Sequence, residues 1–226
     1  MEDIKKILEK PFEGLTKDEF QDKCFDIAKN LFCNYCINCN GRFFYFTELE
    51  FYYWDKDNWN EKWNRVTYPR ISEAKDLFFH LSGVDICFNS YYNKENLDDE
   101  AKFGGILIRA IRDEDGVITA GPWNCMLKML NECRGGFLPY LKDLKTPCNS
   151  QENIKKTYRS LGEKDLEAEK EIATSKVTPL NLCFYDNRYL NVANKNNLKT
   201  QKISLDKNSG KLKPSYSSYK TDRFDE

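Results

Sequence analysis

The sequence predicts a single-domain α+β protein. Its 226 residues suit one sizeable domain, and a hydrophobic content of 40% with 14% aromatic residues is enough for a packed core. Short apolar stretches typical of strands outnumber the segments with helical spacing, and they do not alternate regularly with helices. A sheet core with helices set around it therefore fits better than an alternating α/β fold.

The first clear element is a helix that begins after Thr16. Thr16 and Glu19 have the spacing of a capping box, in which each side chain bonds to the backbone of the other residue. The apolar residues that follow recur at helical spacing: Phe20, Cys24, Ile27, Ala28 and Leu31. The segment from 16 to 32 should therefore form a helix with one apolar face.

A hairpin should follow this helix. The turn signal Asn40–Gly41 separates two candidate strands, residues 33–38 and 42–53. The second strand contains the stretch FFYFTELEFYYW, in which eight aromatic residues surround two acids, Glu48 and Glu50. Either these glutamates mark where the sheet meets water, or at least one is half-buried and functional.

Strict alternation along this strand predicts which side chains share a face. It places Phe44, Phe46, Glu48, Glu50 and Tyr52 together, and the odd-numbered residues on the opposite face.

Patterns further along the chain predict the remaining elements. The expected strands are two around Gly83 within 76–90, one at 104–111 closed by the Asp115–Gly116 turn, and one within 179–192. The expected helices are one that starts at Pro122 and a largely exposed one over 150–173, and residues 55–72 should be a long loop.

Composition and charge divide the chain into two parts. We expect one domain over residues 1–195 and a polar, lysine-rich, poorly ordered segment over 196–226. The net charge is −1, but eight basic residues and one acid lie between Arg188 and Lys220. Such a segment is either a phosphate-binding surface or a plain solvated tail.

The expected location of the protein follows from its composition. No apolar run reaches the roughly 18 residues of a membrane span, and the charged N-terminus lacks the apolar core of a signal peptide. We expect an intracellular protein, cytoplasmic in a prokaryote or nuclear in a eukaryote, with no membrane partner. Nine cysteines, an odd number, indicate free thiols in a reducing compartment.

The spacing Cys33-x-x-Cys36-x-x-Cys39 raises a metal hypothesis. A structural zinc site needs four ligands in two close pairs, but no second pair follows and His80 is the sole histidine. We therefore expect no metal, and the alternative of a cysteine-rich metal-binding module would require stoichiometric zinc in the purified protein.

Arg109 is the charged residue whose position demands an explanation. It lies within the apolar stretch GGILIRAI, where an unpaired arginine is costly. A carboxylate on a neighbouring strand is the expected partner, and a pair with Glu50 would keep that glutamate ionised despite burial. The alternative interpretation is a structural ion pair that links two strands.

The order of motifs resembles the methylpurine-DNA glycosylase family, also called alkyladenine or 3-methyladenine DNA glycosylases. The family's Glu-x-Glu-x-Tyr strand is matched by residues 48–52, its aromatic-to-Asn hairpin by 79–89, and its Leu-Arg-Ala strand by 107–110. GPWNCMLKML resembles its Gly-Pro helix, AKNLFC its Ala-Arg-x-Leu-Leu-Gly and PLNLCFY its Pro-x-Arg-Phe-Tyr. The similarity covers about residues 28–185, and this chain is identified as a divergent member.

The resemblance implies base excision repair on a curved, partly open, barrel-like antiparallel sheet. A monofunctional glycosylase of this kind hydrolyses the N-glycosidic bond of a flipped alkylated or deaminated purine in DNA and leaves an abasic site. It implies Glu50 as general base, Arg109 as the residue that holds Glu50 and contacts a phosphate, Tyr52 and Phe79 as rings around the base, and Asn89 beside the base edge. It implies no cofactor, and we expect a monomer.

Two positions depart from the family. The family has a histidine several residues after the tyrosine, and residues 53–70 contain none. The family's wedge aromatic corresponds to Ser82, which cannot fill a gap in a base stack. The alternative function is therefore a non-catalytic nucleic-acid or nucleotide-binding relative that keeps the base pocket.

Overall fold

A computed structural model gives the architecture of the chain. It describes residues 3–9, 12, 14–55, 59–60, 72–91, 102–158, 182–189, 200–205 and 212–217. The described helices are α1 (Ile4–Glu9), α2 (Lys17–Asn34) and α4 (Pro122–Glu132), with the 3₁₀ turns η1 (Arg134–Gly136) and η2 (Gln151–Asn153). The described strands are β1 (Tyr35–Cys39), β2 (Arg42–Asp55), β3 (Trp59–Asn60), β4 (Leu77–His80), β5 (Gly83–Tyr91), β6 (Lys102–Asp113), β7 (Ile118–Ala120), β8 (Tyr140–Asp143), β9 (Ile154–Tyr158), β10 (Leu182–Asp186), β11 (Thr200–Leu205) and β12 (Leu212–Ser217).

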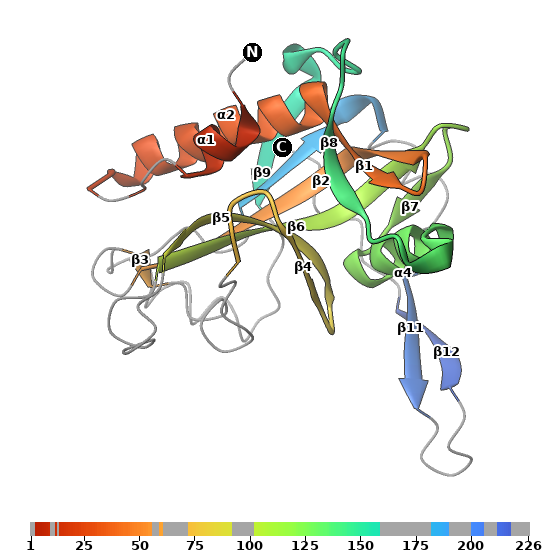
Figure 1. Cartoon of the computed structure of the whole chain (residues 1–226). Coiled ribbons are helices and arrows are strands. Elements are labelled where there is room, and N and C mark those ends of the chain that lie inside the picture. Colours follow the sequence, from red (N-terminus) through yellow and green to blue (C-terminus); the bar gives the residue numbers. More distant parts are fainter. Residues whose placement is uncertain are drawn as a thin grey trace.

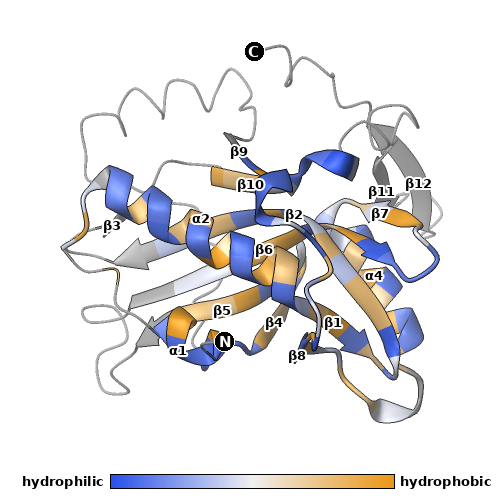
Figure 2. Cartoon of the chain, turned by 90° about the horizontal axis from the view of Figure 1, so that it is seen from above, coloured by the Kyte–Doolittle hydropathy of each residue, from blue (hydrophilic) through white to orange (hydrophobic). Residues whose placement is uncertain are grey.

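One large antiparallel sheet dominates the fold. Its main order is β4-β5-β6-β2-β1-β8, and β10 pairs with residues 48–51 in the middle of β2 and with β9. The sheet curls into a half-barrel, α1 and α2 lie across one of its faces, and α4 packs near the ends of β5, β6 and β7 (Figures 1 and 2). The predicted α+β class is thereby confirmed.

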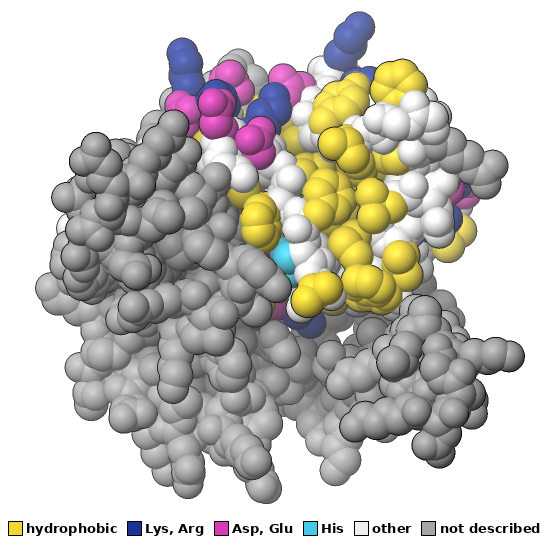
Figure 3. All heavy atoms as spheres, turned by 60° about the horizontal axis from the view of Figure 1, so that its bottom comes forward, with side chains coloured by type: hydrophobic (Ala, Val, Ile, Leu, Met, Phe, Trp, Pro, Cys, Tyr) yellow, Lys and Arg dark blue, Asp and Glu magenta, His cyan; other side chains and the backbone are white. Residues whose placement is uncertain are grey.

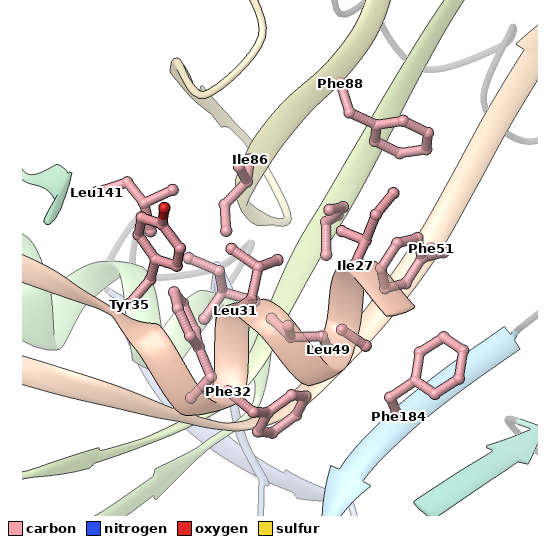
Figure 4. Packing of buried hydrophobic residues seen from close by; sticks show 14 of the residues in the cluster. Ile27, Leu31, Phe32, Tyr35, Leu49, Phe51, Ile86, Phe88, Leu141 and Phe184 are labelled. Carbon is pink, nitrogen blue, oxygen red and sulfur yellow. The ribbon is translucent and has the colours of Figure 1, made fainter. Parts of the chain in front are cut away.

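The core lies between α2 and the sheet. The capping box at Thr16 and Glu19 is present, and all five predicted apolar positions of α2 are buried. The Phe51 ring packs edge-on against Phe184 with the ring centroids 5.2 Å apart. The centroid of Phe51 also lies 5.9 Å from that of Phe88 (Figure 4). Such aromatic pairs add about 0.5–1.5 kcal/mol each beyond the area that they bury.

Gly104 is needed where β6 passes under Phe88. The two residues are directly opposite in the β5–β6 ladder, and a Cβ on Gly104 would overlap the Phe88 ring. A glycine here lets the ring lie flat on the backbone of the neighbouring strand.

Local signals predicted several boundaries and were wrong at others: Cys33 and Asn34, expected in a strand, end α2, and the expected loop over 55–72 contains β3. The β1–β2 hairpin turns at Asn40 and Gly41, both with positive φ, and α4 begins at Pro122 as expected. The helix expected over 150–173 is wrong for residues 151–158, which form η2 and β9. Pairing of β9 with β10 supplies the backbone hydrogen bonds that decide this conformation over helix propensity. The rest of that segment lies outside the described residues.

The C-terminal part contains two paired strands. Strands β11 and β12 pair antiparallel as a separate two-stranded sheet within the lysine-rich segment.

In the part of the chain that the structure describes, no helix is both long and apolar enough to cross a membrane.

Candidate functional site

A pair of irregularities in the β2–β6 ladder builds the candidate site. Phe46 pairs with Ile111, Glu48 with Ala110 and Leu49 with Ile108, so Thr47 and Arg109 are each one extra residue in their strand. Such bulges re-aim side chains and locally disrupt the ladder. At this point both strands therefore switch which of their residues, odd- or even-numbered, face the core.

This switch changes which side chains of β2 share a face. Phe44 and Phe46 join the core together with Leu49, Phe51 and Tyr53. The expectation that Phe44 and Phe46 share a face with Glu48, Glu50 and Tyr52 is therefore wrong. Instead, Phe43 and Tyr45 lie on the face of the glutamates, which is the sheet face turned away from the core and is called the polar face below.

On the polar face, one arginine holds two carboxylates. Arg109 donates from Nε to Glu48 Oε1 at 2.8 Å and from Nη1 to Glu50 Oε2 at 2.6 Å. The Glu50 side chain is fully buried, that of Arg109 is 11% exposed and that of Glu48 is 32% exposed. The predicted pairing of Arg109 with Glu50 is confirmed, and Glu48 completes a three-residue cluster.

Electrostatics keep Arg109 in its charged form. Burial on its own would lower the pKa of Arg109, but the charges of Glu48 and Glu50 outweigh it and raise that pKa well above its usual value. The arginine is therefore a permanent cation, and it offsets part of the cost of burying the Glu50 carboxylate.

The backbone at the bulge is fixed by the start of α4. The Arg109 carbonyl accepts a hydrogen bond from Gly121 N at 2.8 Å and lies 3.5 Å from Cys125 Sγ. Gly121 has a φ of 94°, a left-handed value that favours glycine. The Gly-Pro motif therefore anchors α4 against the residue that holds the two carboxylates.

A second buried pair lies two strands away on the polar face. Asp85 is opposite Leu107, which is opposite Glu50, so all three side chains share this face. His80 Nε2 lies 3.4 Å from Asp85 Oδ2, and Asp85 is fully buried. His80 Nδ1 accepts a hydrogen bond from Ser82 N at 3.2 Å.

The sequence patterns above assign no role to His80 or to Asp85. The signal was available, because an acid within the apolar strand around VDICF demands a partner for the same reason as Arg109.

The structure does not bring all predicted site residues together. Tyr52 lies in β2 two residues after Glu50, half-buried and on the polar face. Phe79 is opposite the core residue Val84 and packs against the core, so the register places it on the other face. Two rings facing each other across a base are therefore not formed by Tyr52 and Phe79.

Asn89 lies inside β5, which continues to Tyr91 rather than ending at Asn89, and its side chain lies outside the described residues.

Phe79 instead lines a cavity of about 480 Å³ between the β4–β5 hairpin and α4. Its other lining residues are Phe78, His80, Leu81, Trp123 and Met126. Figure 3 shows hydrophobic side chains gathered on this side of the molecule, with the histidine at their edge. The cavity is apolar, and neither Glu50 nor Arg109 lines it.

The three cysteines at metal-like spacing do not gather into a site. Cys33 ends up in the last turn of α2, and Cys36 and Cys39 lie in β1. Among the described residues, no group of three or more histidine, cysteine, aspartate or glutamate side chains could hold a metal ion.

The chain was also compared with known proteins. No family model, no curated protein and no solved structure matches it.

Proposed function

We propose that the protein is a monofunctional DNA glycosylase that hydrolyses the N-glycosidic bond of an alkylated or deaminated purine. The observation that carries the proposal is the Glu50 carboxylate, buried on the polar face and held by Arg109 at 2.6 Å. The family resemblance adds the order of motifs around it.

Glu50 has the properties that this chemistry needs. A carboxylate positioned by a fixed cation can orient a water molecule and accept its proton as the water attacks the anomeric carbon. Its negative charge also stabilises the oxocarbenium character of the transition state. The leaving base departs with the bonding electrons, and the sugar gains a hydroxyl group.

Tyr52 supplies an aromatic face beside Glu50. It lies two residues further along β2, and its neighbour across β6 is Gly105, which has no side chain. Stacking of a base on an aromatic ring contributes about 1–3 kcal/mol. Because Glu50 is buried in the free protein, a flipped nucleotide must open the site when it binds.

The β4–β5 hairpin offers an apolar tip near this face. Ser82 is exposed in the turn, and the adjacent Leu81 is 78% exposed. Leucine is among the residues that proteins insert between base steps. Leu81 therefore supplies the apolar side chain that Ser82 lacks.

The test is an abasic-site assay. Labelled single- and double-stranded oligonucleotides with hypoxanthine, ethenoadenine or alkylated purines are incubated with the protein and then treated with alkali. Wild type should give strand breaks, and Glu50→Gln should lower the rate by about 10²–10⁴-fold, the usual contribution of a general base.

Glu48→Gln is the matched control, because Glu48 also bonds Arg109 but is partly exposed. It should retain most of the excision rate. Equal losses in both variants would show that the cluster acts as a structural unit and that Glu50 has no special role.

The second candidate is a nucleic-acid-binding relative without catalysis. The position of Phe79 on the core face favours it, because the base would then have one aromatic wall instead of two. Tight binding of the same oligonucleotides by wild type and Glu50→Gln, without strand breaks from either, would select this function.

A further inference from the structure

Arg112 differs from the other arginine side chains that the structure describes. Arg42, Arg109 and Arg188 each form ion pairs with carboxylates. Among the described residues, no carboxylate oxygen lies within 4.0 Å of Arg112, and its Nε is buried without a hydrogen-bond partner. Arg112 Nη1 donates a long hydrogen bond of 3.4 Å to the Asp113 carbonyl.

Two tyrosine rings hold Arg112 in place. Its guanidinium carbon lies 4.7 Å from the centre of the Tyr45 ring and 5.2 Å from that of Tyr189. Arg188 lies over Tyr189 at 5.1 Å, and we call these four residues the tyrosine–arginine cluster. Ring faces fix the guanidinium plane but provide no counter-ion, so its edge N–H groups remain suited to a phosphate.

The cluster lies on the same face as Glu50. Tyr45 pairs with Arg112, and the neighbours of Tyr45 on both sides, Phe44 and Phe46, belong to the core. Tyr45 precedes Glu50 by five residues, one of them the bulge residue Thr47, which is about 13 Å along the ladder. At about 3.4 Å of rise per nucleotide in a duplex strand, this distance corresponds to about four nucleotides.

Further cations on this face extend the positive charge. Lys142 lies 4.3 Å over the ring of Phe43. Lys155 pairs with Tyr185, which pairs with Glu48, so Lys155 shares the polar face. Asp186 is buried and bonds Arg188 at 2.6 Å, which leaves Arg112, Lys142 and Lys155 to attract an anion. Spaced cations suit an extended polyanion better than a single small one.

We propose that the tyrosine–arginine cluster binds a backbone phosphodiester of the nucleic-acid strand whose base reaches Glu50, with Arg112 as the phosphate ligand. This inference rests on the proposed function for the identity of the strand. It assigns the path of that strand along the polar face, from Glu50 towards Tyr45 and Arg112.

The test measures oligonucleotide affinity over a series of NaCl concentrations by fluorescence anisotropy, with an undamaged labelled strand and its duplex. Arg112→Gln should weaken binding about tenfold at low salt and reduce the salt slope by about 0.7–0.9, the loss of one phosphate contact. Arg112→Lys should keep most of the slope, because it keeps the charge.

Lys29→Gln is the control, since Lys29 also lies over an aromatic ring, Phe25 at 4.6 Å, but on α2 across the opposite face. It should change neither affinity nor slope. A second measurement does not depend on the folding of a variant: phenylglyoxal should modify Arg112 in free wild type and spare it in the oligonucleotide complex, as read by peptide mass spectrometry.

The outcomes separate this inference from the proposed function. Arg112-dependent binding without excision supports the inference and overturns the glycosylase. Excision with an unchanged salt slope in Arg112→Gln, or with Arg112 equally modified in the complex, overturns the inference alone. Failure of wild type to bind any strand overturns both.

Discussion

The two faces of β2 differ in burial and in how their buried side chains are held. On the core face, Leu49, Phe51 and Tyr53 pack against apolar side chains from several elements, and many small contacts share the stabilisation. On the polar face, Glu50 is equally buried, and Arg109 forms an ion pair with it at 2.6 Å. Burial therefore identifies the core only when the chemistry of the face is also known, and the polar face is where function should be sought.

The largest expected effect comes from breaking the ion pair on the polar face. Arg109→Leu leaves the buried Glu50 charge without its cation, and breaking a buried pair in this way costs about 3–5 kcal/mol. The free energy of unfolding, measured in urea, should fall by that amount.

The double variant Arg109→Leu/Glu50→Leu sharpens this result. Replacing both partners by apolar residues is often close to neutral, so the double variant should be more stable than Arg109→Leu alone. If the losses in the free energy of unfolding caused by the two substitutions simply add, the two residues do not stabilise each other, contrary to the geometry.

A smaller effect is expected on the core face. Gly104→Ala places a methyl group against the Phe88 ring, and overpacking of this kind costs about 1–3 kcal/mol. The melting temperature and the urea midpoint should both fall.

Phe88→Leu provides the matched test of this contact, because a smaller side chain removes the overlap. Gly104→Ala should cost less in the Phe88→Leu background than in wild type. An equal cost in both backgrounds would place the strain elsewhere in β6.

The smallest effect concerns pH and a buried thiol. Burial raises the pKa of Cys36 to about 12, so the folded protein binds this thiol proton more tightly than the unfolded chain. Its contribution to stability is fully present below the unfolded thiol pKa of about 8.5 and is lost as pH rises from there through about 12.

The measurement is the free energy of unfolding between neutral pH and about pH 10, within the range where the thiol of the unfolded chain ionises. Cys36→Ala should flatten the fall relative to wild type. The same slope in both proteins would assign the alkaline loss to other groups.

Sequence patterns predicted the elements that local chemistry determines. The capping box of α2, the Asn40–Gly41 turn and the start of α4 at Pro122 all depend on short-range bonds and dihedral preferences. The Arg109–Glu50 pair was also predictable, because a charge in an apolar strand must find a partner. The sequence does not decide between solvent and burial for Glu48, and the structure adds it to the cluster.

What depends on tertiary pairing was not predictable. In β2 the odd-numbered and the even-numbered positions are both rich in aromatic residues, so hydrophobicity alone could not locate the bulge at Thr47. The same holds for β9, whose lysine-rich sequence becomes a strand through pairing with β10. The face of Phe79 followed from the hairpin register, which no residue in the motif specifies.

The matched bulges at Thr47 and Arg109 also determine how the gene can change. Each adds one residue to its strand, so the two offsets cancel and the ladder resumes its register beyond them. Deleting the codon for Thr47 alone would turn Phe44 and Phe46 outward and expose apolar rings, since a one-residue slip exchanges the faces of a strand. Only a length change in both strands preserves the core, so single-codon insertions and deletions between Phe46 and Leu49 should be tolerated far less than substitutions there.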